Sequence, residues 1–160
     1  MKSLYMETTI VGHIAGRLHP DPYVSSRQKV TREWWKTESS RFSLYISQLV
    51  LDECADGDPS AADERLEVVK ELDLVDTSEE VDALAGDFVA KNAVPHTEPR
   101  DAFHIAIAAV NGIDYLLTWN FKHIANATKR VIIGQICWEA GFVPPVICTP
   151  EELLGIDHGH

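Results

Sequence analysis

The chain is 160 residues long and carries 25 acidic residues against 14 lysines and arginines, a formal net charge of −11. This length predicts one domain with a single core, spanning residues 1–160. No apolar run approaches the roughly 20 residues that a membrane span needs, and the N-terminal residues do not resemble a signal peptide. Cys54, Cys137 and Cys148 lack CxxC or metal-ligand spacing, so we expect buried, reduced thiols and a cytoplasmic location.

The negative charge is concentrated in one block of the chain. Between Asp52 and Asp87 there are 14 acidic residues against Arg65 and Lys70, whereas the rest of the chain is close to neutral. Residues 27–41 are locally positive, which fits a solvated helix face as well as a surface that binds a polyanion. The net charge therefore does not exclude a nucleic-acid partner.

The first 55 residues predict two strands and three helices. Apolar spacing places strands at 3–6 and 41–47 and helices at 8–18, 24–40 and 48–55. Ser47 is placed to cap the third helix. In that helix Glu53 shares a face with Leu49 and Val50 and should point inward, whereas Asp52 should be exposed.

The remaining residues continue the alternation of helices and strands. Helices are predicted from 58–60 to 72, at 78–92, at 99–110 and over part of 121–137, and strands at 74–75, 113–118 and 146–148, with a terminal turn at 149–152. Residues 102–110 are apolar on every side apart from His104, so this helix should be buried on all faces. It leads into a strand that is apolar on both faces, which is typical of a parallel α/β sheet.

Four polar side chains lie next to the predicted strands. Glu7 follows the first strand and Asn120 the fourth, while Glu53 lies in the helix after the second strand and Asp101 begins the helix before the fourth. Ligands of open parallel sheets gather at the carboxyl ends of the strands, so we expect these residues to face one cleft. Carboxylates so close together repel one another unless a cation is bound, and oxygen ligands favour Mg²⁺ or Mn²⁺ over zinc. Such an ion can activate water against a phosphodiester.

Taken together, these motifs resemble a PIN domain, and within that family the VapC-type toxins of bacterial toxin–antitoxin systems. The resemblance rests on an acid followed by TTIVGHIAG at the first strand, S-x5-E at 47–53, DAFHIAIA at 101–108 and DYLLTWN at 114–120, and it covers residues 4–154. It implies a three-layer α/β/α sandwich, a metal-dependent endoribonuclease, a homodimer and a cognate antitoxin.

The resemblance also implies roles for individual residues. Glu7, Glu53 and Asp101 match the three metal-binding acids, and Asn120 matches the fourth polar position of the catalytic site. Two positions depart from the family pattern, because that pattern has Asp at the position of Glu7 and often Asp at that of Asn120. Weaker Mg²⁺ binding, a preference for Mn²⁺ or low activity would each follow.

Several neighbouring residues have weaker claims to a role. Thr8 and Thr118 are candidates for holding water or hydrogen-bonding a metal ligand. His104 fits a phosphate-orienting role, although a hydrogen-bonded core histidine is the favoured interpretation. Lys122 and His123 fit RNA-backbone contacts and a solvated loop equally well. Base stacking by the tryptophans is less favoured than packing in the core or a dimer; these are Trp34, Trp35, Trp119 and Trp138.

The preferred hypothesis is an RNA-cleaving enzyme in which Glu7, Glu53 and Asp101 hold the metal and Asn120 assists. Basic side chains such as Lys122, Arg130 or Arg32 would position the RNA strand. The alternative is a catalytically weakened PIN-like module that acts through protein or RNA binding. A third hypothesis is a metal phosphatase or DNA nuclease, since the same ligands serve any phosphodiester.

Overall fold

Five parallel strands form one sheet in the described part of the chain, in the order β3-β2-β1-β4-β5. The computed structural model describes residues 1–154, so the last six residues of the predicted domain lie outside it. The strands are β1 (Lys2–Met6), β2 (Phe42–Ile46), β3 (Asp73–Leu74), β4 (Tyr115–Leu117) and β5 (Val146–Cys148). Because β1 pairs with both β2 and β4, Leu4 lies opposite Leu44 on one side and Tyr115 on the other. Glu7 therefore leaves the sheet at the middle of its carboxyl edge.

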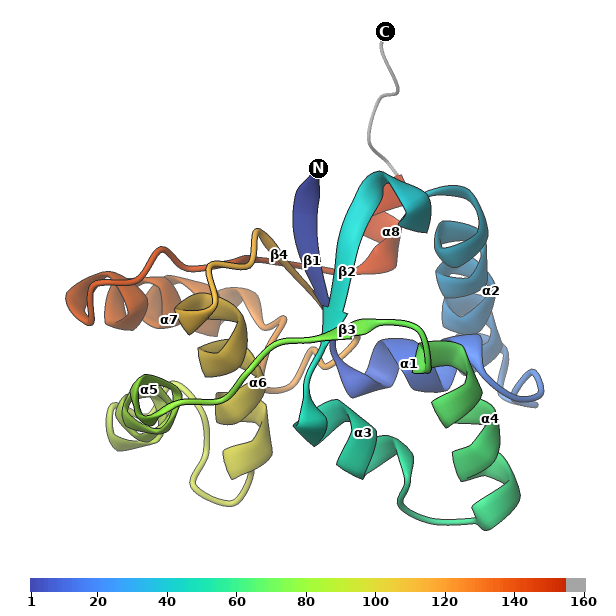
Figure 1. Cartoon of the computed structure of the whole chain (residues 1–160), viewed down its shortest axis with the longest axis horizontal. Coiled ribbons are helices and arrows are strands. Elements are labelled where there is room, and N and C mark those ends of the chain that lie inside the picture. Colours follow the sequence, from blue (N-terminus) through green and yellow to red (C-terminus); the bar gives the residue numbers. More distant parts are fainter. Residues whose placement is uncertain (155–160) are drawn as a thin grey trace, which may run out of the picture.

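Helices cover both faces of this sheet, as the expected α/β/α sandwich requires. They are α1 (Thr8–Ile14), α2 (Pro22–Thr37), α3 (Gln48–Cys54), α4 (Pro59–Val69), α5 (Glu79–Ala90), α6 (Pro99–Val110), α7 (Ala127–Glu139) and α8 (Pro150–Leu154), with a 3-10 turn at Ser39–Arg41. Figure 1 shows α5, α6 and α7 grouped on one side of the strands and α1, α2 and α4 on the other. The predicted fold class is confirmed.

The core is built from large apolar side chains of the sheet and of the helices that cover its two faces. Tyr5 and Leu116 from the strands, Trp34 from α2, Phe88 from α5 and Ile105 from α6 are almost fully buried. Burying a side chain of this kind contributes roughly 1.5–3 kcal/mol of transfer free energy. Helix α6 is buried on nearly every side, as predicted; Phe103 and Val110 are its partly exposed apolar residues.

The first helix is shorter than the sequence predicts. It ends at Ile14 rather than near Leu18, and Gly16 then takes a φ of +79°, a conformation that glycine adopts without steric cost. Arg32 satisfies the freed carbonyl groups, because its guanidinium donates to the backbone oxygens of His13, Ala15 and Gly16. The apolar spacing continues to Leu18, but this cap ends the helix earlier.

The segment after β4 also differs from its prediction. Residues 121–125 form turns, and α7 begins only at Ala127, where the side chain of Asn126 accepts from Thr128 N. The N-cap at Asn126 explains the late start, because its carboxamide satisfies a free N–H of the first turn. Among residues 1–154, no helix is long and apolar enough to span a bilayer.

Candidate metal and catalytic site

Glu7 is the buried acid at the centre of the carboxyl edge. It is 4% exposed and is the N-cap of α1, where one carboxylate oxygen accepts from Thr9 N at 3.0 Å. The other oxygen accepts from the hydroxyls of Thr9 and Thr118, at 2.5 and 2.6 Å. These donors stabilise a carboxylate that burial alone would disfavour.

Glu53 reaches the same place from α3. Its Oε1 accepts from Thr8 Oγ1 and from His104 Nε2, both at 2.6 Å, while Oε2 lies 3.9 Å from the guanidinium of Arg100. Burial acts to raise the pKa of Glu53, but His104, Thr8 and Arg100 together outweigh it and lower that pKa below its ordinary value. Glu53 is therefore ionised at neutral pH. The neighbouring Asp52 is exposed, as the helical periodicity predicts.

His104 is buried in α6 with hydrogen bonds on both ring nitrogens. It is 1% exposed, and its Nδ1 lies 2.7 Å from the hydroxyl of Tyr5, which lies 2.7 Å from Ser47 Oγ. The favoured interpretation of His104 as a hydrogen-bonded core residue is thus confirmed. Burial raises the pKa of the Tyr5 hydroxyl, which therefore stays protonated.

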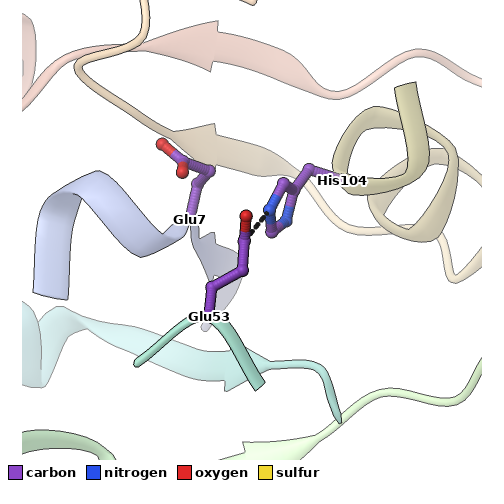
Figure 2. A group of neighbouring side chains, drawn as sticks. All are labelled: Glu7, Glu53 and His104. Carbon is purple, nitrogen blue, oxygen red and sulfur yellow. Dashed lines mark hydrogen bonds and ion pairs between the residues drawn. The ribbon is translucent and has the colours of Figure 1, made fainter. Parts of the chain in front are cut away.

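Glu7, Glu53 and His104 form one compact group, which we call the acid cluster. One ligand atom from each of them lies within 4.8 Å of the other two. Figure 2 shows the three side chains, which come from the end of β1, from α3 and from α6, with Glu53 directed at the imidazole ring. The sequence analysis did not predict that His104 contacts Glu53, because nothing in the local sequence pattern shows that the helix of His104 faces Glu53.

Asp101 and Asn120 belong to a neighbouring arrangement around His123. Asp101 Oδ2 lies 2.7 Å from His123 Nδ1, and Asn120 Oδ1 accepts from the backbone N of His123 at 3.0 Å. Asn120 N donates to Thr118 Oγ1, which in turn donates to Glu7. Asp101 is not a member of the acid cluster in the described chain. The structure thus brings Glu7 and Glu53 together and places Asp101 beside His123.

Three basic residues are held by contacts within the protein. His123 is mostly buried against Asp101 and does not lie in a solvated loop. The guanidinium of Arg32 caps α1, and that of Arg130 donates to Ala125 O, so these two are largely engaged within the protein. Lys122 is exposed. Both arginines are a poorer match to an RNA-positioning role than their charge suggested, because backbone carbonyls already hold them.

The donor set of the acid cluster fits a hard divalent cation. The two carboxylates supply oxygen ligands, and no described donor hydrogen-bonds to Oε2 of Glu53, whose charged neighbour is the guanidinium of Arg100 at 3.9 Å. The hydroxyl of Thr8 donates to Oε1 of Glu53 and that of Thr118 to Oε1 of Glu7, in the way that outer hydrogen bonds orient metal ligands. A cation between Glu7 and Glu53 would also relieve the repulsion of two carboxylates held this close.

Comparison with known proteins supports the fold. No protein-family model and no curated protein sequence matches the chain. Among solved structures, the chain is similar to one in the crystal structure of VapBC2 from Rickettsia felis bound to a DNA fragment from their promoter. The TM-score is 0.51 with 17% sequence identity, over 91% of this chain and 98% of that one. A likeness at this identity shows a shared α/β fold, in agreement with the sheet and helices described above.

Proposed function

We propose that this protein is a Mg²⁺- or Mn²⁺-dependent endoribonuclease and the toxin of a toxin–antitoxin pair. The observation that carries the proposal is the meeting of Glu7 and Glu53 at the central carboxyl edge of a parallel sheet. The fold shared with a chain of VapBC2 adds support from an independent direction. Glu7 and Glu53 would hold the cation, with Asp101 as a further ligand and Asn120 assisting.

Each residue of the site has a chemical task in this proposal. A bound Mg²⁺ or Mn²⁺ would supply an activated water and neutralise charge at the phosphodiester. Thr8 and Thr118 hold the two carboxylates in fixed orientations, and His104 prevents Glu53 from turning away. Asn120 fixes the backbone at His123, which holds the carboxylate of Asp101.

A basic pocket beside Asp101 suits the phosphates of the substrate. It measures about 330 Å³ and its lining includes His96, Lys122, His123 and Lys129 but no acidic residue. In a chain of net charge −11, a pocket lined in this way favours an anionic ligand. Lys122 keeps its proposed contact with the RNA backbone, and contacts of this kind make binding weaken with salt.

The decisive experiment compares two neighbouring acids of α3. Purified protein is incubated with single-stranded RNA and Mn²⁺ or Mg²⁺, with and without chelator. We expect Glu53→Gln to lower the cleavage rate by more than about 100-fold, because it removes a charge from the metal site. The exposed Asp52 provides the matched control, so Asp52→Asn should cleave at the wild-type rate.

The same assay tests the place of Asp101. Asp101→Asn should abolish both cleavage and the growth arrest that expression of a toxin causes. Cleavage that persists in chelator, or that Glu53→Gln leaves unchanged, would disprove the proposed activity. Parallel assays with DNA and with phosphomonoesters separate a ribonuclease from a general nuclease or a phosphatase.

One observation favours the alternative of a non-cleaving, PIN-like binding module. Protein donors already make three hydrogen bonds to Glu7, which leaves its carboxylate little free capacity for a cation. Calorimetric titration distinguishes the two functions. Metal binding that Glu53→Gln abolishes favours the enzyme, and the absence of metal binding together with binding of RNA or a neighbour-encoded protein favours the module.

The proposed protein partners are a cognate antitoxin and a second copy of the chain. Val131 and Trp138 lie seven residues apart on α7, which places them on one face, and both are largely exposed. An exposed apolar face of this kind supports an oligomer. Sedimentation of the purified protein, alone and with the product of the adjacent gene, measures both associations.

A further inference from the structure

A second pocket lies between α2, the residues that follow β4, and α8. We call it the aromatic pocket. Its volume is about 330 Å³, and it is lined by Tyr23, Ser26, Arg27, Val30, Trp119, Phe121 and Glu151. Tyr23 and Phe121 are 73% and 42% exposed. Exposed aromatic rings gathered around one hollow mark a binding surface rather than a part of the core.

Arg27 stands among the three rings of this pocket. Its guanidinium carbon lies 5.2 Å from the ring centre of Tyr23, 5.4 Å from that of Trp119 and 5.0 Å from that of Phe121. Within residues 1–154, the contacts of this guanidinium are with these rings, and no hydrogen bond or ion pair engages its N–H groups. The pocket thus offers planar aromatic surfaces together with charged donors that are free to bind a ligand.

The inner wall of the aromatic pocket is rigid and is connected to the acid cluster. The indole N–H of Trp119 donates to Thr31 Oγ1 at 2.7 Å, which fixes the ring from within the core. The backbone N of Trp119 donates to Thr9 Oγ1, and that hydroxyl donates to Glu7. A single residue, Thr9, therefore links the pocket wall to the proposed metal ligand.

We propose that the aromatic pocket binds one unpaired base of a single-stranded RNA whose backbone passes the acid cluster. This inference rests on the proposed ribonuclease function and specifies its substrate as a strand with a splayed base near the cleaved bond. Phe121 and Tyr23 would stack on the base, and Arg27 would donate to a base oxygen or nitrogen or to the adjoining phosphate. A base within a duplex is already stacked and is not available to the pocket.

The charges and the size of the pocket favour a base over other ligands. Glu151 lines the pocket, so a small free anion would meet repulsion, whereas a neutral base can donate an amino group to this carboxylate. The volume accommodates one flat ring system but is small for a helical peptide. A single side chain of a protein partner is the competing occupant, and the experiment below separates it from RNA.

The test measures RNA binding without cleavage. Full-length Glu53→Gln protein is titrated, in chelator, against a fluorescein-labelled single-stranded RNA octamer of mixed sequence, and anisotropy gives the affinity. Adding Phe121→Ala or Tyr23→Ala should weaken binding on the order of 5- to 150-fold, the range for loss of one stacked base. Val143→Ala shortens an exposed apolar side chain outside the pocket and should leave the affinity unchanged.

A second pair of variants tests Arg27 against a matched charge. Arg27→Gln and Lys29→Gln both remove one positive charge from α2, but only Arg27 lines the pocket. We expect weaker RNA binding only for Arg27→Gln. The loss caused by Phe121→Ala should be the same factor at low and high salt, whereas Lys122→Gln should reduce the salt dependence itself.

Each outcome of these titrations bears on the proposal. It is overturned if Phe121→Ala binds RNA as tightly as its parent, if duplex RNA binds as well as the single strand, or if no RNA binds at all. It is also overturned if the pocket variants lose only the binding of a neighbour-encoded protein and still bind RNA as tightly as their parent. The pocket variants could lose RNA affinity while the unmutated protein fails to cleave RNA in the presence of metal. In that case the pocket assignment stands and the proposed nuclease activity is disproved.

Discussion

Within the acid cluster, His104 holds one oxygen of Glu53 by a hydrogen bond. The protonated Tyr5 hydroxyl can donate to Nδ1 of this histidine, which leaves Nε2–H to donate to Glu53. In that arrangement His104 orients a carboxylate and does not itself bind a cation. Helical periodicity identified Glu53, rather than Asp52, as the inward acid. It did not identify His104 as the partner of Glu53, since that contact joins two helices far apart in sequence.

Asp114 provides a residue-scale prediction about pH. Its carboxylate accepts from Ser3 N at 2.9 Å and from Ser3 Oγ at 3.2 Å, and these hydrogen bonds lower its pKa below the ordinary value. The unfolded chain therefore binds a proton at Asp114 more readily than the folded protein does. The stability that the ionised carboxylate contributes is present above the ordinary pKa of aspartate, and it is lost as the pH falls through the lower pKa of Asp114 in the folded protein. Asp114→Asn should reduce the loss of stability between neutral and acidic pH by less than about 1 kcal/mol, because the side chain is only partly buried and solvent weakens the effect of its hydrogen bonds.

Urea unfolding at a series of pH values measures this effect. Asp87 lies in α5, and within residues 1–154 no side-chain hydrogen bond engages its carboxylate, so Asp87→Asn serves as the control. Identical acid dependence of Asp114→Asn and the unmutated protein would contradict the proposed role of the Ser3 contact.

Helix α6 is the element whose burial is most directly predicted by its own sequence. Its alanines and isoleucines pack against α5 and the sheet, and Ala102, Ala106 and Ala108 have no exposed surface. Small residues let neighbouring elements approach closely, so there is no room for larger side chains. The nearly all-apolar sequence predicted this burial correctly. The partner of Asp101 at the start of the helix was not predictable, because it comes from the turn after β4.

A substitution in α6 tests this packing at the scale of the element. Ala106→Leu should destabilise the protein by about 1–3 kcal/mol, because added methyl groups overpack a filled core. Ala83→Leu on α5 is the matched control, since Ala83 is exposed and the same exchange of alanine for leucine has the same effect on helix propensity at both sites. Urea unfolding of the two variants measures the difference, and equal stabilities would show that α6 has unfilled space beside it.

At the scale of the whole molecule, three thiols report on the integrity of the core. Cys54, Cys137 and Cys148 are buried and unpaired, as expected from their spacing. Burial raises the pKa values of Cys54 and Cys137 to about 11 and that of Cys148 to about 12. These thiols are therefore protonated at neutral pH and shielded from reagents.

We expect a thiol reagent to leave the folded protein unmodified at neutral pH and to modify three cysteines in urea. Mass spectrometry of the protein with and without denaturant counts the modified residues. A cysteine that reacts rapidly in the folded protein would show that its part of the core opens locally.

The sequence by itself determined the order of helices and strands, their parallel arrangement and the inward direction of Glu53, because periodicity and capping are local properties of the chain. Helix ends such as Ile14 were set instead by Arg32, a residue of another helix. Only the tertiary structure decided which polar groups meet. The strand order places Glu7 at the centre of the sheet edge, α6 brings His104 to Glu53, and the turn after β4 brings His123 to Asp101. Contacts between distant segments depend on how helices pack across the sheet, and local sequence patterns do not encode that packing.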